Sequence, residues 1–140
     1  MSHHGSLATQ PTGHRAQVLI LEGVFDGSNS DRFERAIDDA IDAGRPDVIV
    51  DLRGVSFLDS KMLRALVRGL DRTRAEDRRF ALIRPNPHVW RVFVLTGLSR
   101  ALPAFGGVAD ALTSFAAVAG GARIRSSAVP SSFRGTGGTR

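Results

Sequence analysis

The sequence predicts an α/β domain in which a mostly parallel sheet of four to five strands packs against about four helices. Short apolar runs alternate along the chain with segments whose apolar residues recur every three or four positions. This alternation is typical of a parallel sheet with right-handed crossovers. The 140 residues suit one domain, which we expect to span residues 15–119.

Four apolar runs have the length and composition of strands. The second is rich in β-branched residues and is bounded by Pro46 and Gly54, as expected for a strand covered on both faces. The fourth contains Pro103, which cannot donate to a ladder, so we expect an edge strand there. The expected strands are Gln17–Leu21, Val48–Leu52, Phe80–Ile83 and Leu102–Phe105.

Amphipathic spacing predicts the helices. For the first helix, Ser28, Asn29 and Ser30 are candidate N-caps, and Asp31 is placed for a capping box with Ser28. This helix ends at Gly44, and its outer side is acidic. Two later helices are expected at about 88–95 and 110–119, and Leu95 can face inward in the first of these. The acidic side of the first helix consists of Asp31, Glu34, Asp38, Asp39 and Asp42.

The remaining helix, which is the second along the chain, is expected to begin at Ser60 and to end near Arg74. Its apolar residues fall on one side, and the basic residues fall together on the opposite side. The basic stripe is either a solvated face or a docking face for an acidic partner, and the acidic helix has the same two interpretations. The apolar side is Leu63, Leu66, Val67 and Leu70, and the basic stripe is Lys61, Arg64, Arg68 and Arg72.

The two ends of the chain differ in composition from the domain between them. Residues 1–14 are polar and predict a flexible segment, and residues 120–140 predict a disordered basic tail rich in Gly and Ser. Four arginines in the tail supply most of the net charge of +5, so the body of the protein is nearly neutral. We therefore expect no direct nucleic-acid partner.

The sequence lacks the residue patterns of an enzyme, a cofactor site or a metal site. It has no Walker loop and no Gly-x-Gly-x-x-Gly, and His88 has no nucleophile or acid at a diagnostic spacing. Asp26, Asp51 and Asp59 could suggest a metal pocket, but Asp51 lies within a strand and Asp59 at a helix start. We therefore expect a protein without catalytic residues, cofactor or metal.

Several absences favour a cytoplasmic protein. Cysteine does not occur, so neither disulfides nor thiolate chemistry is available. No apolar run approaches the roughly 18 residues of a membrane span, and the first residues do not have the composition of a signal peptide. We expect no membrane partner, and the sequence leaves the oligomeric state open.

Asp59 and Ser60 stand where the chain enters the helix that begins at Ser60. Both are good N-cap residues, and a plain structural cap is one interpretation of Ser60. The other interpretation is a phosphoacceptor, because the first turn of a helix carries unpaired amides and partial positive charge that favour a phosphate.

Three ordered motifs resemble the STAS domain, the fold of bacterial anti-sigma factor antagonists. The stretch Asp51–Ser60 resembles the family signature, and Leu21–Asp26 resembles the end of its first strand. Leu95–Phe105 resembles its segment from a helix to the last strand, and the resemblance spans about residues 17–119. The family often begins with an extra strand, which we expect to be missing or degenerate because residues 1–14 have little strand character.

The resemblance implies an antagonist that binds an anti-sigma factor serine kinase and thereby frees a sigma factor. The partner binds ATP and phosphorylates the antagonist, and the motif places the acceptor at Ser60. In the family, Ser or Thr and then Gly usually follow the acceptor, whereas this sequence has Lys61 and Met62 at these positions. We expect the Met62 side chain to project toward the partner. A STAS scaffold without phosphorylation, in a regulatory assembly, is the alternative. The expected partner-binding residues are Asp26, Asp59, Ser60, Lys61, Met62 and Arg64.

Overall fold

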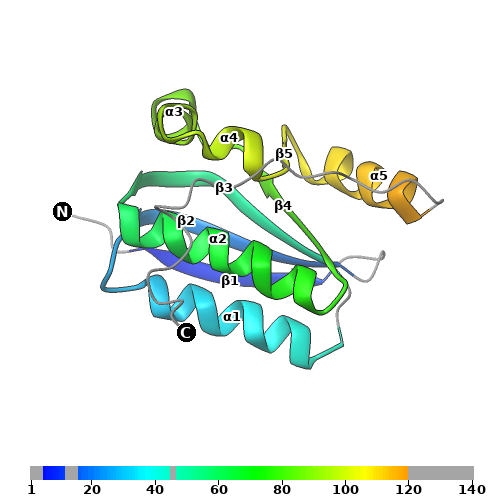
Figure 1. The fold of residues 1–140 in the computed structure, drawn as a ribbon. Helices are drawn as coiled ribbons and strands as arrows, with labels where there is room; N and C mark the ends of the chain where they lie inside the picture. The colour runs from blue at the N-terminus through cyan, green and yellow to red at the C-terminus, as the bar shows by residue number, and fades with distance from the viewer. Residues whose placement is uncertain (1–4, 12–15, 45–46, 120–140) are drawn as a thin grey trace.

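The computed structural model describes residues 5–11, 16–44 and 47–119 as an α/β fold (Figure 1). The five strands form one sheet in the order β1-β2-β3-β4-β5. β1 is antiparallel to β2, and the other neighbouring pairs are parallel, which confirms the predicted class. The elements are β1 (Ser6–Pro11), β2 (Ala16–Phe25), α1 (Ser30–Asp42), β3 (Asp47–Leu58), α2 (Ser60–Ala75), β4 (Arg79–Ile83), α3 (Pro87–Thr96), α4 (Leu98–Ala101), β5 (Ala104–Phe105) and α5 (Val108–Ala119).

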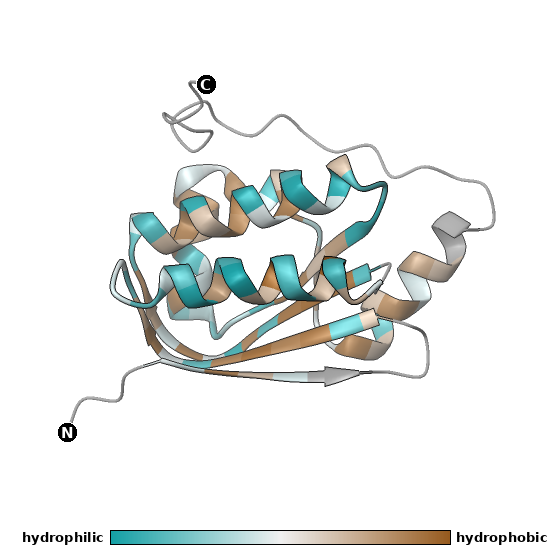
Figure 2. Ribbon diagram, turned by 90° about the horizontal axis from the view of Figure 1, so that it is seen from below, coloured by the Kyte–Doolittle hydropathy of each residue, from teal (hydrophilic) through white to brown (hydrophobic). Residues whose placement is uncertain are grey.

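Helices cover both faces of the sheet. α1 and α2 run side by side along one face, where the larger apolar cluster lies (Figure 1). α5 covers a smaller cluster on the other face through Ala111 and Phe115. In β3, Val48 and Val50 belong to the larger cluster and Ile49 to the smaller one, as the alternation of side chains along a strand requires. Figure 2 shows the apolar residues concentrated along the strands and the polar residues on the outer sides of the helices.

The N-terminal strand was not expected from the sequence. β1 pairs with β2 from Ser6 opposite Glu22 to Pro11 opposite Gln17, so the expectation of a missing or degenerate strand is wrong. The weak strand propensity of this segment is overridden because the edge of β2 offers backbone hydrogen bonds and Leu7 packs against the larger cluster. The rest of the predicted flexible segment and the predicted tail lie outside the described residues.

α3 also differs from the expectation. Only Val89 and Phe93 of this helix are buried, whereas Leu95 is 72% exposed. Leu95 follows Phe93 by two residues and therefore lies about 200° around the helix from it. The expectation that Leu95 faces inward is wrong, because α3 buries a narrow stripe and ends at Gly97, which has a φ of 82°.

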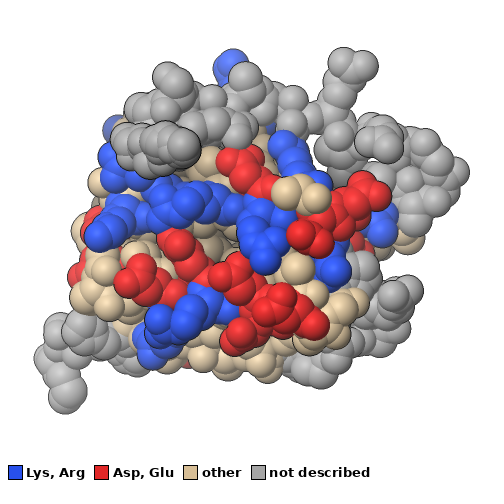
Figure 3. Space-filling model, turned by 60° about the horizontal axis from the view of Figure 1, so that its bottom comes forward, with Lys and Arg blue, Asp and Glu red and all other residues tan. Residues whose placement is uncertain are grey.

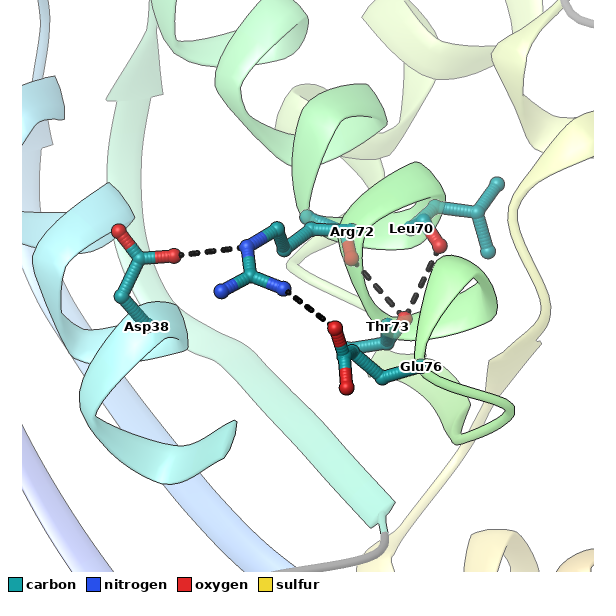
Figure 4. Close-up of polar contacts among 6 residues, drawn as sticks. Asp38, Leu70, Arg72, Thr73 and Glu76 are labelled. Carbon is teal, nitrogen blue, oxygen red and sulfur yellow. Dashed lines mark hydrogen bonds and ion pairs between the residues drawn. The ribbon is translucent and has the colours of Figure 1, made fainter. Parts of the chain in front are cut away.

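The basic stripe of α2 pairs largely with the acidic side of α1. Arg68 forms an ion pair with Glu34, and Arg72 forms one with Asp38 at 3.1 Å and one with Glu76 at 3.4 Å. Figure 3 shows the two signs of charge interleaved on this side of the molecule, and Figure 4 shows Arg72 between Asp38 and Glu76. The four side chains that pair across the two helices are still 33–53% exposed, which agrees with the solvated interpretation, and their ion pairs join the two helices to each other.

Candidate functional site

The candidate site lies where two parallel strands end. Phe25 at the end of β2 is opposite Leu58 at the end of β3. The loop Asp26–Asn29 follows the first strand, and Asp59 and the start of α2 follow the second. The carboxyl ends of adjacent parallel strands are where open α/β sheets place their binding sites.

Asp59 connects the two segments. Its backbone amide donates to the carbonyl of Phe25 at 3.1 Å, which extends the pairing of the strands by one bond. One carboxylate oxygen accepts from the amide of Met62 at 2.9 Å, so Asp59 is the N-cap of α2. The other oxygen accepts from the amide of Gly27 at 3.1 Å, which ties the loop to the helix start.

The loop Asp26–Asn29 is held by its own side chains. The carboxylate of Asp26 accepts hydrogen bonds from the amide and the hydroxyl of Ser28. The side chain of Asn29 is buried, and it bonds the Asp26 amide at 2.8 Å and the Val24 carbonyl at 2.9 Å. The loop therefore presents one fixed conformation beside α2.

Ser60 occupies the first helical position and is exposed. Because Asp59 is the cap, Ser60 has no capping role, and its hydroxyl makes no hydrogen bond with any described residue. The cap satisfies the third amide of the helix, whereas the amides of Ser60 and Lys61 have no acceptor within the described part of the chain. The hydroxyl is thus accessible next to two donors that can bind an anion.

Lys61 lies against the loop, and Arg64 lies one turn further along α2. A Cβ atom added to Gly27 would be 3.0 Å from the Cδ atom of Lys61, so the lysine side chain covers this glycine closely. Arg64 is partly buried. Neither residue forms an ion pair with the residues that the structure describes, in contrast to Arg68 and Arg72.

Met62 does not belong to the surface. Its side chain is 0% exposed and lies in the larger apolar cluster, so the expectation that it projects toward a partner is wrong. Met62 precedes Leu66 by four residues and therefore shares the buried side of α2. The four-residue spacing between Met62 and Leu66 in the sequence therefore already indicated that Met62 is buried.

Phe57 is an exposed aromatic residue that the sequence did not single out for the site. It lies in β3, three residues before Ser60, and is 51% exposed. Because Leu58 packs inward, adjacent Phe57 points to the other face of the strand, and no helix covers it fully.

Asp51 lies apart from Asp26 and Asp59, in the middle of β3. Burial raises the pKa of its carboxyl, but the hydrogen bonds and the charge of Arg53 lower it by more, so the net shift is downward. The carboxylate oxygens accept from the guanidinium of Arg53 at 3.0 and 2.7 Å. Within residues 5–11, 16–44 and 47–119, no group of three or more acidic or histidine side chains is arranged to hold a metal ion.

None of the helices in the described part of the chain combines the length and apolar character needed to cross a membrane.

A family model described as "Mlab, STAS domain" matches residues 8–125. This match covers most of the chain, and the protein therefore belongs to the STAS domain family. A comparison with curated proteins finds no match.

Solved structures of anti-sigma factor antagonists share the fold. The antagonist from Mycobacterium paratuberculosis is 24% identical and has a TM-score of 0.72, and the alignment covers 81% of this chain and 97% of that one. SpoIIAA in its unphosphorylated form is 21% identical with a TM-score of 0.68, covering 80% and 97%. Bacillus SpoIIAA in the phosphorylated form is 21% identical with a TM-score of 0.61, covering 79% and 99%. These neighbours are described as antagonists rather than as enzymes.

Proposed function

We propose that this protein is an anti-sigma factor antagonist that binds an anti-sigma factor serine kinase and is switched by phosphorylation of Ser60. The kinase binds ATP, and the antagonist acts without a cofactor in the cytoplasm. The observation that carries the proposal is the exposed hydroxyl of Ser60, which bonds no described residue, on a first helical turn that Asp59 fixes. A kinase can reach this hydroxyl without displacing any bond within the described residues.

The proposed contact surface consists of the loop beside α2 and the outer side of its first turns. We include Phe57 in this surface in place of the buried Met62, because Phe57 is 51% exposed and stands three residues before the acceptor. Aromatic residues are enriched at the buried centre of interfaces. The surface residues are Asp26, Phe57, Asp59, Ser60, Lys61 and Arg64.

Phosphorylation would act through local electrostatics. The phosphate adds roughly 1.5 to 2 negative charges beside the carboxylate of Asp59. In the free protein, the amides at the start of α2 and the ammonium group of Lys61 offset this charge. Under a closely packed partner the phosphate must also lose water, and a penalty of about 3 kcal/mol would weaken binding more than a hundredfold.

The alternative function, a STAS scaffold without phosphorylation, is favoured only by Lys61 and Met62, the two residues at which the sequence departs from the family pattern. Met62 is buried, so its side chain cannot obstruct a kinase, and only Lys61 still favours this alternative. The two functions differ in one observable property, which is the incorporation of phosphate at Ser60.

The test begins with capture of partners on the full-length protein, which mass spectrometry then identifies. The captured kinase is incubated with ATP and with the wild type, Ser60→Ala or Ser56→Ala, and the labelled residue is mapped. Ser56 is a matched control because it is another exposed serine close to the site. Label on wild type and Ser56→Ala, but not on Ser60→Ala, supports the proposal. Label at another residue, or no label on the wild type, overturns the phosphorylation switch.

A further inference from the structure

Asn29 is a buried polar residue whose side chain both accepts and donates a hydrogen bond that holds a loop. It is 7% exposed, which is unusual for an asparagine. Its carbonyl oxygen accepts from the Asp26 amide and its amide nitrogen donates to the Val24 carbonyl. Leaving such groups without partners in a buried place is unfavourable, so this side chain fixes the backbone on both sides of the loop.

Gly5, which directly precedes β1, packs against the side chain of Asn29. A Cβ atom on Gly5 would lie 2.7 Å from the amide nitrogen of Asn29 and 2.6 Å from the Val24 carbonyl oxygen, so only glycine fits. The guanidinium of Arg32 donates to the Gly5 carbonyl at 2.6 Å and holds this segment in place. Asn29 therefore has little freedom to turn away from its two partners.

A series of bonds leads from Asn29 to the helix that carries Ser60. Asn29 fixes the amide of Asp26, and the next residue is Gly27, whose amide donates to Asp59. The second oxygen of Asp59 caps the amide of Met62. The conformation of the loop thus determines whether Asp59 can bind both amides at once.

We propose that Asn29 is a positioning residue for Ser60, acting through Gly27 and Asp59 to hold the loop and the first turn of α2 as one rigid surface. Asn29 does not touch the acceptor. Its effect on phosphorylation rests on the function proposed above, whereas its effect on the two amides does not. A partner that recognises both segments then binds a surface that is already formed, which avoids the entropy of ordering the loop.

The first test is hydrogen exchange of the Gly27 and Met62 amides in the wild type, Asn29→Ala and Asn29→Asp. Thr73→Val is the matched control, because Thr73 is 0% exposed and also bonds two backbone groups, the carbonyls of Gly69 and Leu70 near the far end of α2. In Asn29→Ala the protection of both amides should fall by about tenfold or more, as for the loss of a buried hydrogen bond. In Thr73→Val it should change by less than about twofold.

Asn29→Asp retains the acceptor for the Asp26 amide but places a carboxylate oxygen against the Val24 carbonyl in place of the donor, so protection of both amides should fall in this variant as well. This variant carries the test if Asn29→Ala does not fold. Equal exchange at Gly27 and Met62 in the Asn29 variants and in Thr73→Val would overturn the proposal, because Asn29 would then be a structural residue only.

The second test measures phosphorylation kinetics with the kinase identified above, at a temperature where all variants are folded. Asn29→Ala should raise KM about fivefold or more and leave kcat within about twofold, since recognition and not chemistry loses a preformed surface. Thr73→Val should leave both values unchanged. An unchanged KM in Asn29→Ala would overturn the effect on recognition. If no kinase labels Ser60, the proposed function fails, and the amide exchange still decides the role of Asn29.

Discussion

The carboxylate of Asp59 accepts a hydrogen bond from the amide of Gly27 at 3.1 Å, and it caps Met62 with its other oxygen. Asp59→Ala removes both bonds and should lower the free energy of unfolding by about 1 to 2 kcal/mol, as for the loss of an N-cap. Asp59→Asn keeps a capping oxygen and should cost less than half of this. Urea unfolding of the two variants checks the prediction, and equal losses would contradict the double role of the carboxylate.

Ser60→Ala should leave the free energy of unfolding within about 0.5 kcal/mol of the wild type, because the hydroxyl bonds no described residue. The variant should bind the partner and remain bound in the presence of ATP. Ser60→Glu should weaken that binding by about tenfold or more relative to Ser60→Gln, which has the same shape without the charge. Titration calorimetry measures both affinities, and similar values for Glu and Gln would exclude charge as the switch.

Met62→Ala and Lys61→Ser distinguish the roles of the two residues that depart from the family pattern. Met62→Ala should lower the free energy of unfolding by about 2 to 5 kcal/mol, because it empties space in the core. Lys61→Ser should change stability by less than about 0.5 kcal/mol and should raise the initial rate of phosphorylation if the lysine hinders the kinase. Thermal melts and initial rates with one purified kinase provide the measurements. Equal initial rates would show that Lys61 has no part in recognition.

The pair Asp51 and Arg53 gives a dependence of stability on pH. The pKa of Asp51 is lowered in the folded protein, so the stability that this carboxyl contributes is present above its ordinary value of 3.8 and is lost as pH falls through the folded pKa. Arg53→Ala removes the guanidinium but keeps the backbone hydrogen bond from residue 53, so the pKa of Asp51 should be higher in this variant than in the wild type. The stability that the carboxylate contributes above pH 3.8 should therefore be smaller in Arg53→Ala, because fewer interactions favour the charged form in the folded protein.

The experiment compares unfolding free energies in urea at about pH 3 and about pH 6, which bracket the titration of aspartate. The difference between the two pH values should be smaller in Arg53→Ala than in the wild type. Arg91→Ala is the control, because Arg91 is an exposed arginine with no ion pair among the described residues. The same pH dependence in Arg53→Ala and Arg91→Ala would contradict the assignment.

The sequence predicted the parallel core well, because each central strand has a strong apolar pattern of its own. Val48 and Val50 are buried in β3, and Leu63 and Leu66 form the inner side of α2, as expected. β1 was missed because its stability comes from pairing with β2, and a pairing partner leaves no mark on local composition. The pairing between α1 and α2 was missed for a related reason: charge patterns do not show which helices become neighbours.

The site was predicted in part. The spacing placed Asp59 and Ser60 at a helix start, but it left open which residue is the cap, and the structure gives that role to Asp59. Burial of Met62 could have been predicted from its distance of four residues to Leu66. Asn29 was one of three candidate N-caps of α1, and it holds that position without a capping bond from its side chain. Its role in the loop gave no signal, because that role depends on the carbonyl of Val24 and on Gly5, which approaches from a distant part of the chain.

The packing of Gly5 against Asn29 also fixes where the chain enters the domain. Gly5 lies against Phe25 and Asn29, and the Phe25 carbonyl accepts from the amide of Asp59, so a segment attached before Gly5 starts beside the loop Asp26–Asn29. A ligand for this surface that is fused upstream of Gly5 would meet it at a local concentration in the millimolar range if the linker is short and flexible. An N-terminal fusion is therefore a direct way to trap weak partners of this surface. For the same reason, a bulky N-terminal affinity tag should compete with the partner that it is meant to capture.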